Sequence, residues 1–173
     1  MTLNIAIIGA GIAGITAART LAKAGHHVHV FEKSRGAGGR MSTRQTEFGG
    51  FDHGTQYFTV RDKRFAKALL TAQTVVRPWS ANTVRVLDDK GRVLASAPPP
   101  TEPHFVAKPG MNALVGHWAE PLAHPERFGD LNARTLLQHR VVRIERDALD
   151  GRCARDRDRG TRQTRRCAVA TQG

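Results

Sequence analysis

The chain has few cysteines, few aromatic residues and no long apolar segment. Its two cysteines, Cys153 and Cys167, have the spacing of neither a redox motif nor a zinc site. Aromatic residues make up only 6% of the sequence, which argues against the stacking platforms of a specific nucleic-acid binder. Polar residues interrupt the apolar N-terminal stretch, so it fits neither a signal peptide nor a membrane span. We therefore expect a cytoplasmic protein with no membrane partner and no specific nucleic-acid partner.

Acidic residues are also scarce relative to basic ones. The 173 residues hold 27 Lys and Arg against 15 Asp and Glu, for a formal net charge of +12. Residues 151–173 contribute seven Arg against two Asp and contain no aromatic residue. This composition is typical of a disordered basic tail, and an alternative hypothesis is a shift of the reading frame near Asp150. The remaining positive charge suits an anionic cofactor, and any contact with nucleic acid would be salt-sensitive and independent of sequence.

Three glycines follow the first apolar stretch at a spacing that predicts phosphate binding. Residues 3–8 are apolar on both faces, which predicts a buried parallel strand. Gly9, Gly11 and Gly14 come next in the order G-x-G-x-x-G. Gly9 permits a tight turn, Gly11 permits close approach of a diphosphate, and Gly14 permits close packing of helix on sheet.

A helix is predicted directly after this turn. Residues 12–24 are mostly good helix formers without proline, and Gly25 supplies the C-terminal cap. The backbone N–H groups of Ile12 and Ala13, together with those of Gly11 and Gly14, are then expected to hold a diphosphate. The spacing therefore predicts a dinucleotide site.

An acidic residue ends the next predicted strand, residues 27–32. Glu32 stands where a carboxylate accepts hydrogen bonds from ribose hydroxyls and repels a 2′-phosphate. The adenosine half is thus expected to come from FAD or NAD rather than from NADP. The alternative to a dinucleotide site is a glycine-rich turn in an unrelated strand–helix–strand unit. The order of strand, glycine turn, helix, second strand and acidic residue argues against that alternative.

A second glycine cluster follows Glu32 after a short loop. Gly38 and Gly39 permit another close backbone approach, and Arg40 supplies a forked cationic donor for phosphate oxygens. Because a nicotinamide dehydrogenase does not need this second phosphate contact, the pair of clusters favours FAD over NAD.

These motifs resemble the FAD-binding start of the flavin-containing amine oxidase superfamily. The segments "FDHGTQYFT" and "VAKPGMNALVGHWA" are similar to its renalase-like branch, and the likeness covers about residues 1 to 150. The resemblance implies that Gly54, Thr55 and Gln56 lie near the flavin ring and that the backbone of Val141 faces adenine. Positions shared with the family motif are Gly9, Gly11, Gly14, Ala18, Leu21, Gly25, Val28, Val30, Glu32, Gly38, Gly39 and Arg40.

The expected fold class is α/β, with a Rossmann-like FAD-binding βαβ unit and an inserted partial α+β substrate domain. The parallel sheet is expected to draw its third strand from residues 138–146. Other predicted elements are a helix over 62–72, a hairpin of 83–87 with 92–97, a stiff connector at Pro98–Pro100 and a helix over 111–119. The expected domains are a βαβ unit with its Gly-Gly-Arg loop over 1–48, the insertion over 49–110, the return helix and adenine-side strand over 111–150 and the tail over 151–173. Because relatives in that superfamily are longer, we expect a truncated copy.

Few residues are candidates for catalysis. His53, Gln56 and Tyr57 come where the resemblance implies the flavin face, although a turn position also explains His53. No catalytic residue is assigned. His26, His27 and His29 are interpreted as a strand end and its solvated face, and no metal is expected. Because no cysteine precedes residue 151, the FAD is expected to be non-covalent.

The function implied by the resemblance is hydride transfer from a small-molecule amine or reduced nicotinamide-type substrate to FAD and then to oxygen. Two alternatives stay open: an NAD-dependent dehydrogenase, which Glu32 permits, and an inactive FAD-binding fragment.

Overall fold

A computed structural model describes residues 1–79, 84–97, 102–129, 131–144, 146–147, 152–153 and 169–172. The chain divides into two compact units. Unit 1 consists of Met1–Gly39 and Trp118–Gly173, and unit 2 consists of Arg40–His117. The sequence analysis predicted these boundaries near residues 48 and 110.

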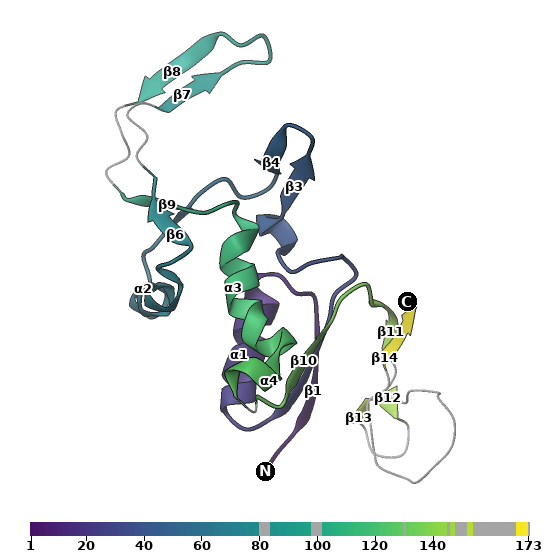
Figure 1. Ribbon diagram of the computed structural model, residues 1–173. Coiled ribbons are helices and arrows are strands. Elements are labelled where there is room, and N and C mark those ends of the chain that lie inside the picture. Colours follow the sequence, from purple (N-terminus) through teal and green to yellow (C-terminus); the bar gives the residue numbers. More distant parts are fainter. Residues whose placement is uncertain are drawn as a thin grey trace. The chain divides into compact units, whose positions relative to one another are not determined.

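Unit 1 is built on a parallel three-stranded sheet. Its strands β1 (Asn4–Ile8), β2 (His27–Phe31) and β10 (Ala133–Leu136) lie in the order β1-β2-β10. Helix α1 (Ile12–Lys23) is the crossover between β1 and β2 and runs beside them (Figure 1). The predicted strand–helix–strand order is therefore confirmed, and the bounds of each element lie within one residue of the prediction. The predicted burial of the first strand is wrong, because the residues of β1 are exposed or half-buried.

Small and β-branched residues bring α1 close to the sheet. Ile15 and Ala18 of the helix are fully buried, as are Val28 and Val30 of β2. The helix ends in a Schellman motif, because the N–H of residue 26 bonds to the carbonyl of Leu21 and that of residue 25 bonds to residue 22. The predicted glycine cap thus has a defined hydrogen-bonding role.

The third strand of the sheet differs from the prediction. β10 pairs with β2 through Ala133 opposite Val28, whereas the expected strand forms β11 (Arg140–Ile144), which pairs antiparallel with β14 (Val169–Gln172). β10 is short, and its inward residues, Ala133 and Thr135, are too small and polar for a clear apolar signal. Residues 140–144 are largely exposed, as expected for a strand of a two-stranded ribbon rather than for the interior of a sheet.

Two short strands lie in the segment 151–173, for which the sequence predicts disorder. β14 lies within it, and so does β13 (Arg152–Cys153), which pairs with β12 (Arg146–Asp147). Residues 154–168 lie outside the described part of the chain. Unit 1 also contains α4 (Pro125–Phe128) and the last part of α3 (Asn112–Ala123).

Unit 2 is mainly antiparallel. Its hairpins are β3 (Thr43–Thr46) with β4 (Gly49–Asp52) and β7 (Val84–Leu87) with β8 (Val93–Ala97). A separate sheet has the order β5-β9-β6 and consists of β5 (Phe58–Thr59), β9 (His104–Ala107) and β6 (Val76–Pro78). Its helical elements are α2 (Lys63–Leu69), 3₁₀ turns at Gly39–Met41 and Leu70–Ala72, and the first part of α3 (Asn112–Ala123).

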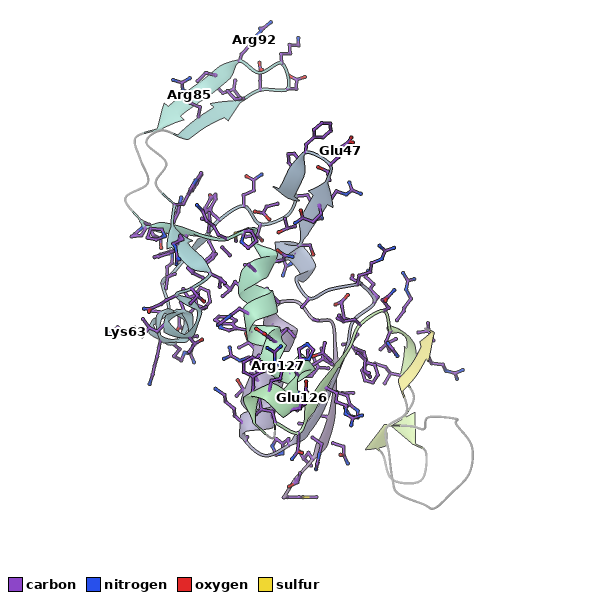
Figure 2. All side chains as sticks on the ribbon, viewed as in Figure 1. Glu47, Lys63, Arg85, Arg92, Glu126 and Arg127 are labelled. Carbon is purple, nitrogen blue, oxygen red and sulfur yellow. The ribbon has the colours of Figure 1, made fainter. Side chains whose placement is uncertain are left out.

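Local hydrogen bonds explain two of the predicted elements in unit 2. Asp62 caps α2 by accepting from the N–H groups of Arg64 and Phe65. Asp88 closes the β7–β8 hairpin by accepting from the N–H groups of Lys90 and Arg92, and Figure 2 labels Arg92 on this hairpin. The predicted connector at residues 98–100 lies outside the described residues.

Candidate dinucleotide site

The turn after β1 requires glycine where the helix meets it. A Cβ on Gly14 would lie 2.0 Å from the carbonyl oxygen of Gly9 and 3.3 Å from a side-chain carbon of Ile7. The N–H of Gly9 donates to the carbonyl of Phe31 at 2.8 Å, which fixes the turn to the end of β2. The first turn of α1 therefore starts directly against the chain that leaves β1.

The N-terminus of α1 presents backbone donors rather than a side-chain cap. Gly11 is the N-cap and makes no side-chain capping bond, and no acidic residue lies in the first turn. The N–H groups of Ile12, Ala13 and Gly14 belong to this first turn, where an anion is favoured. A Cβ on Gly11 would have only an ordinary contact, 3.8 Å from the Cα of Gly39, so the expected need for close approach of a ligand at Gly11 stays a prediction.

The second glycine cluster contacts the first. The N–H of Gly38 donates to the carbonyl of Ala10 at 2.9 Å, and Gly38 also forms an isolated parallel bridge with Gly11. Gly39 has a φ of +59°, and a Cβ there would lie 3.1 Å from the Cα of Gly11. The two loops therefore meet backbone to backbone.

Glu32 is the buried acid beside these loops. Its side chain is 7% exposed, and each carboxylate oxygen accepts a backbone hydrogen bond, from Ala10 N–H at 2.7 Å and from Ser34 N–H at 2.8 Å. Its own N–H donates to the carbonyl of Leu136 at 2.9 Å, and its carbonyl accepts from the N–H of His139 at 2.8 Å. Glu32 thereby connects the first glycine loop to the ends of β2 and β10.

These hydrogen bonds keep the acid ionised. Burial would raise the pKa of Glu32, but the backbone N–H of Ala10 and then the N–H and hydroxyl of Ser34 lower it, with a smaller contribution from Lys33. The pKa of Glu32 therefore lies below its ordinary value. Each oxygen keeps further acceptor capacity, so the predicted ribose contact remains chemically available.

In unit 2 the structure brings Arg40 together with the predicted flavin-side segment. Thr55 N–H donates to the carbonyl of Arg40 at 2.9 Å, and a Cβ on Gly54 would lie 2.2 Å from the same oxygen. Gly54 thus permits the close backbone contact that fixes the Arg40 main chain. Gln56 and His53, which the sequence placed nearby, are exposed.

Tyr57 belongs to an aromatic cluster that the sequence did not predict. Its ring stacks on His104, with centroids 4.2 Å apart, and on Trp79, with centroids 5.4 Å apart. Tyr57 is 43% exposed and Trp79 is 41% exposed. The cluster lies at the β5-β9-β6 sheet of unit 2.

The sequence analysis did not predict a carboxylate that forms hydrogen bonds at the start of α3. One oxygen of Asp52 accepts from the N–H of Met111 at 2.9 Å and from the hydroxyl of Thr43 at 2.6 Å. The same hydroxyl oxygen accepts from the N–H of Asn112 at 3.3 Å. An Asp at a strand end followed much later by a helix gives no local signal of this pairing.

Val141 makes none of the contacts described above, and two residues that contact Glu32 were not predicted. Val141 lies in β11 opposite Thr171, so its adenine contact stays a prediction. Ala10 and Ser34 were not predicted as site residues. The Ser34 contact is local, two residues from Glu32, whereas the Ala10 contact joins residues far apart in the sequence and leaves no local signal.

The segment that contains the two glycine loops is similar to a known protein family. Residues 7–72 match the NAD(P)-binding Rossmann-like domain. The chain is 43% identical over 60 residues, 35% of its length, to 4,4'-diapophytoene desaturase (4,4'-diaponeurosporene-forming) of Staphylococcus haemolyticus, and covers 12% of that protein. It is 44% identical over 52 residues, 30% of its length, to the same enzyme of Staphylococcus aureus strain Newman, and covers 10% of it. The chain thus spans about a tenth of these curated relatives.

A solved structure agrees with this fold. A probable FAD-dependent monooxygenase from Pseudomonas aeruginosa superposes with a TM-score of 0.50 at 20% identity, over 88% of this chain and 40% of that one. The protein is therefore a mixed α/β chain, and its residues 7–72 are similar to a Rossmann-like domain.

The part of the chain that the structure describes has neither a membrane-spanning helix nor a metal-binding group of side chains. No helix there is both long and apolar enough to span a membrane. No three His, Cys, Asp or Glu side chains there are grouped so that they could hold a metal ion.

Proposed function

We propose that this chain is the FAD-binding part of a flavin-dependent oxidoreductase. The observation that carries the proposal is the direct hydrogen bond between Gly38 N–H and the carbonyl of Ala10, beside a buried, ionised Glu32. Two glycine loops in contact offer backbone to both sides of one diphosphate, and the acid at the end of β2 suits the adjoining ribose.

The local similarity to a desaturase supports this function. Desaturation removes two hydrogen atoms from a substrate and is therefore an oxidation. The residues that match the Rossmann-like domain, 7–72, include both glycine loops. Because the chain covers only about a tenth of that enzyme, the reaction, substrate and partners of this protein are proposals.

Each predicted site residue has a role in this proposal. Backbone N–H groups at the start of α1 bind the diphosphate, Arg40 neutralises it, and Glu32 accepts from the ribose hydroxyls. On the resemblance to the amine oxidase superfamily, Thr55 and Gln56 lie near the flavin ring and Val141 faces adenine. The flavin is held non-covalently.

When bound, FAD would accept a hydride from the substrate and pass two electrons to oxygen, giving hydrogen peroxide. The substrate is a small amine or a reduced nicotinamide, as in the renalase-like branch. The residues of this chain bind and orient the cofactor and exclude water from it. The protein acts in the cytoplasm, without a membrane or a specific nucleic-acid partner.

A second candidate function is NAD binding in a dehydrogenase. The NAD(P)-binding description of the matching domain favours it, and Glu32 permits NAD while repelling the 2′-phosphate of NADP. The contact between the glycine loops and the Arg40 that follows them favour FAD.

Equilibrium binding to the purified chain distinguishes these functions. The protein is titrated with FAD, NAD and NADP in parallel, followed by flavin fluorescence for FAD and by calorimetry for the other two. We expect saturable binding of one FAD, weaker binding of NAD and the weakest binding of NADP. Tight binding of NAD without FAD would establish the second candidate, and a folded chain that binds none of the three would refute both.

A further inference from the structure

The peptide units of Ala10 link Glu32 to both glycine loops. The N–H of Ala10 donates to a carboxylate oxygen of Glu32 at 2.7 Å in a buried contact. The carbonyl of Ala10 accepts from the N–H of Gly38 at 2.9 Å. A single residue, which was not a predicted site residue, therefore connects the acid to the loop that precedes Arg40.

Only a carboxylate satisfies the donors around position 32. Ala10 N–H and Ser34 N–H point to different oxygens of Glu32, and both oxygens act as acceptors. A glutamine offers only one acceptor oxygen and an NH₂ group. The NH₂ group would lie against the second N–H group, so two hydrogen-bond donors would face each other. Because the side chain is 7% exposed, water cannot readily replace the missing acceptor.

The main chain fixes the acid in this place without help from a ligand. Glu32 N–H donates to Leu136 and its carbonyl accepts from His139, at the end of β10. The partners of Glu32 in these bonds, Ala10, Ser34, Leu136 and His139, all belong to unit 1. The carboxylate is thus positioned in the nucleotide-free chain.

We propose that Glu32 is a positioning residue for the diphosphate: its carboxylate fixes Ala10, and through Ala10 the Gly38 loop, before a nucleotide binds. This inference rests on the proposed function and extends it, because the ribose hydroxyls would use the remaining acceptor capacity of the same two oxygens. Glu32 would then strengthen phosphate binding even for a ligand that has no ribose hydroxyl.

The test pairs Glu32→Gln with Glu47→Gln. Glu47 is exposed in the turn between β3 and β4 of unit 2 (Figure 2), so the control makes the same chemical change at an exposed position that makes none of the Glu32 contacts. Calorimetry measures the binding of ADP and of 2′,3′-dideoxy-ADP, which lacks both ribose hydroxyls, to the wild type and both variants.

A residue that acts only on the ribose and a residue that positions the loop give different results. In the first case, Glu32→Gln weakens ADP and leaves dideoxy-ADP unchanged. In the second, which we expect, it weakens dideoxy-ADP as well, by about tenfold, as for the loss of one charge-assisted hydrogen bond. Glu47→Gln should bind both ligands like the wild type. An unchanged affinity for dideoxy-ADP in Glu32→Gln overturns the proposal.

Amide hydrogen exchange without nucleotide supplies an independent measurement. In the wild type we expect the amides of Ala10 and Gly38 to be protected like those of β2, and in Glu32→Gln to exchange about tenfold faster or more. Exchange of Ala10 at the rate of an unprotected loop in the wild type refutes the anchor, even if the variant does not fold. If the wild type binds neither nucleotide, the proposed function fails, while the exchange result still decides whether Glu32 positions the loop.

Discussion

Replacing Gly14 by alanine tests whether the first helix must start directly against the turn after β1. The added Cβ would lie 2.0 Å from the carbonyl oxygen of Gly9 and 3.2 Å from its carbonyl carbon. Because both atoms belong to the backbone, the overlap is relieved only if the turn or the helix moves. Overpacking of this kind costs about 1 to 3 kcal/mol, and we expect the upper end, about 3 kcal/mol.

Gly116→Ala is the matched control. Gly116 lies inside α3, is exposed and has no atom within 4 Å of an added Cβ. Alanine removes the entropic penalty of a helical glycine there, so we expect about 0.5 to 1 kcal/mol of stabilisation. The same chemical change should therefore have opposite signs at the two positions.

Thermal unfolding followed by circular dichroism measures both effects. For a chain of this size 1 kcal/mol corresponds to about 2 to 4 °C, so Gly14→Ala should lower Tm by roughly 6 to 12 °C and Gly116→Ala should raise it slightly. Gly14→Ala should also lose FAD binding, since the displaced helix start carries the phosphate donors. Equal Tm values and equal FAD affinities for the two variants would refute this reasoning.

Three further predictions follow from the polar contacts. Asp52→Ala leaves the buried N–H of Met111 without its acceptor and should destabilise the chain by about 1 to 3 kcal/mol in denaturant unfolding; an unchanged midpoint would contradict the capping role. NMR titration should give Asp62 a pKa of about 2, caused first by the side-chain hydrogen bond from Arg64 and then by its backbone N–H, and Arg64→Ala should raise that pKa towards 3.8. Folding lowers the pKa of Glu32. The wild type should therefore be more stable than Glu32→Gln by its full amount above a pH of about 4.3, and this difference should shrink as the pH falls through the lowered pKa. A difference in stability that grows in acid would contradict the lowered pKa.

The opening strand, helix and second strand could be predicted because each has a local cause. Residues 3–8 are apolar on both faces, the glycine spacing fits a tight turn, and residue 25 forms the Schellman motif that ends α1. Asp62 and Asp88 likewise act within four residues of their own positions. Local capping and periodicity therefore account for most of the correct elements.

The errors concern pairings that no local pattern records. β10 enters the parallel sheet through Ala133, a residue with little apolar signal, whereas residues 140–144, which are rich in Val and Ile, pair with β14. The contacts of Ala10 with Glu32 and of Asp52 with Met111 join residues far apart in the sequence. The candidate site was predictable as a set of glycines and one acid, while the hydrogen bonds that unite them required the structure.

The central claim is that the two glycine loops bind the same diphosphate. The most direct test is a titration of the ¹⁵N-labelled chain with FAD, followed through the backbone amide signals of Gly11–Gly14 and of Gly38 and Gly39. The account predicts that signals of both loops shift together and yield one dissociation constant. Shifts confined to one loop, or two different dissociation constants, would contradict it.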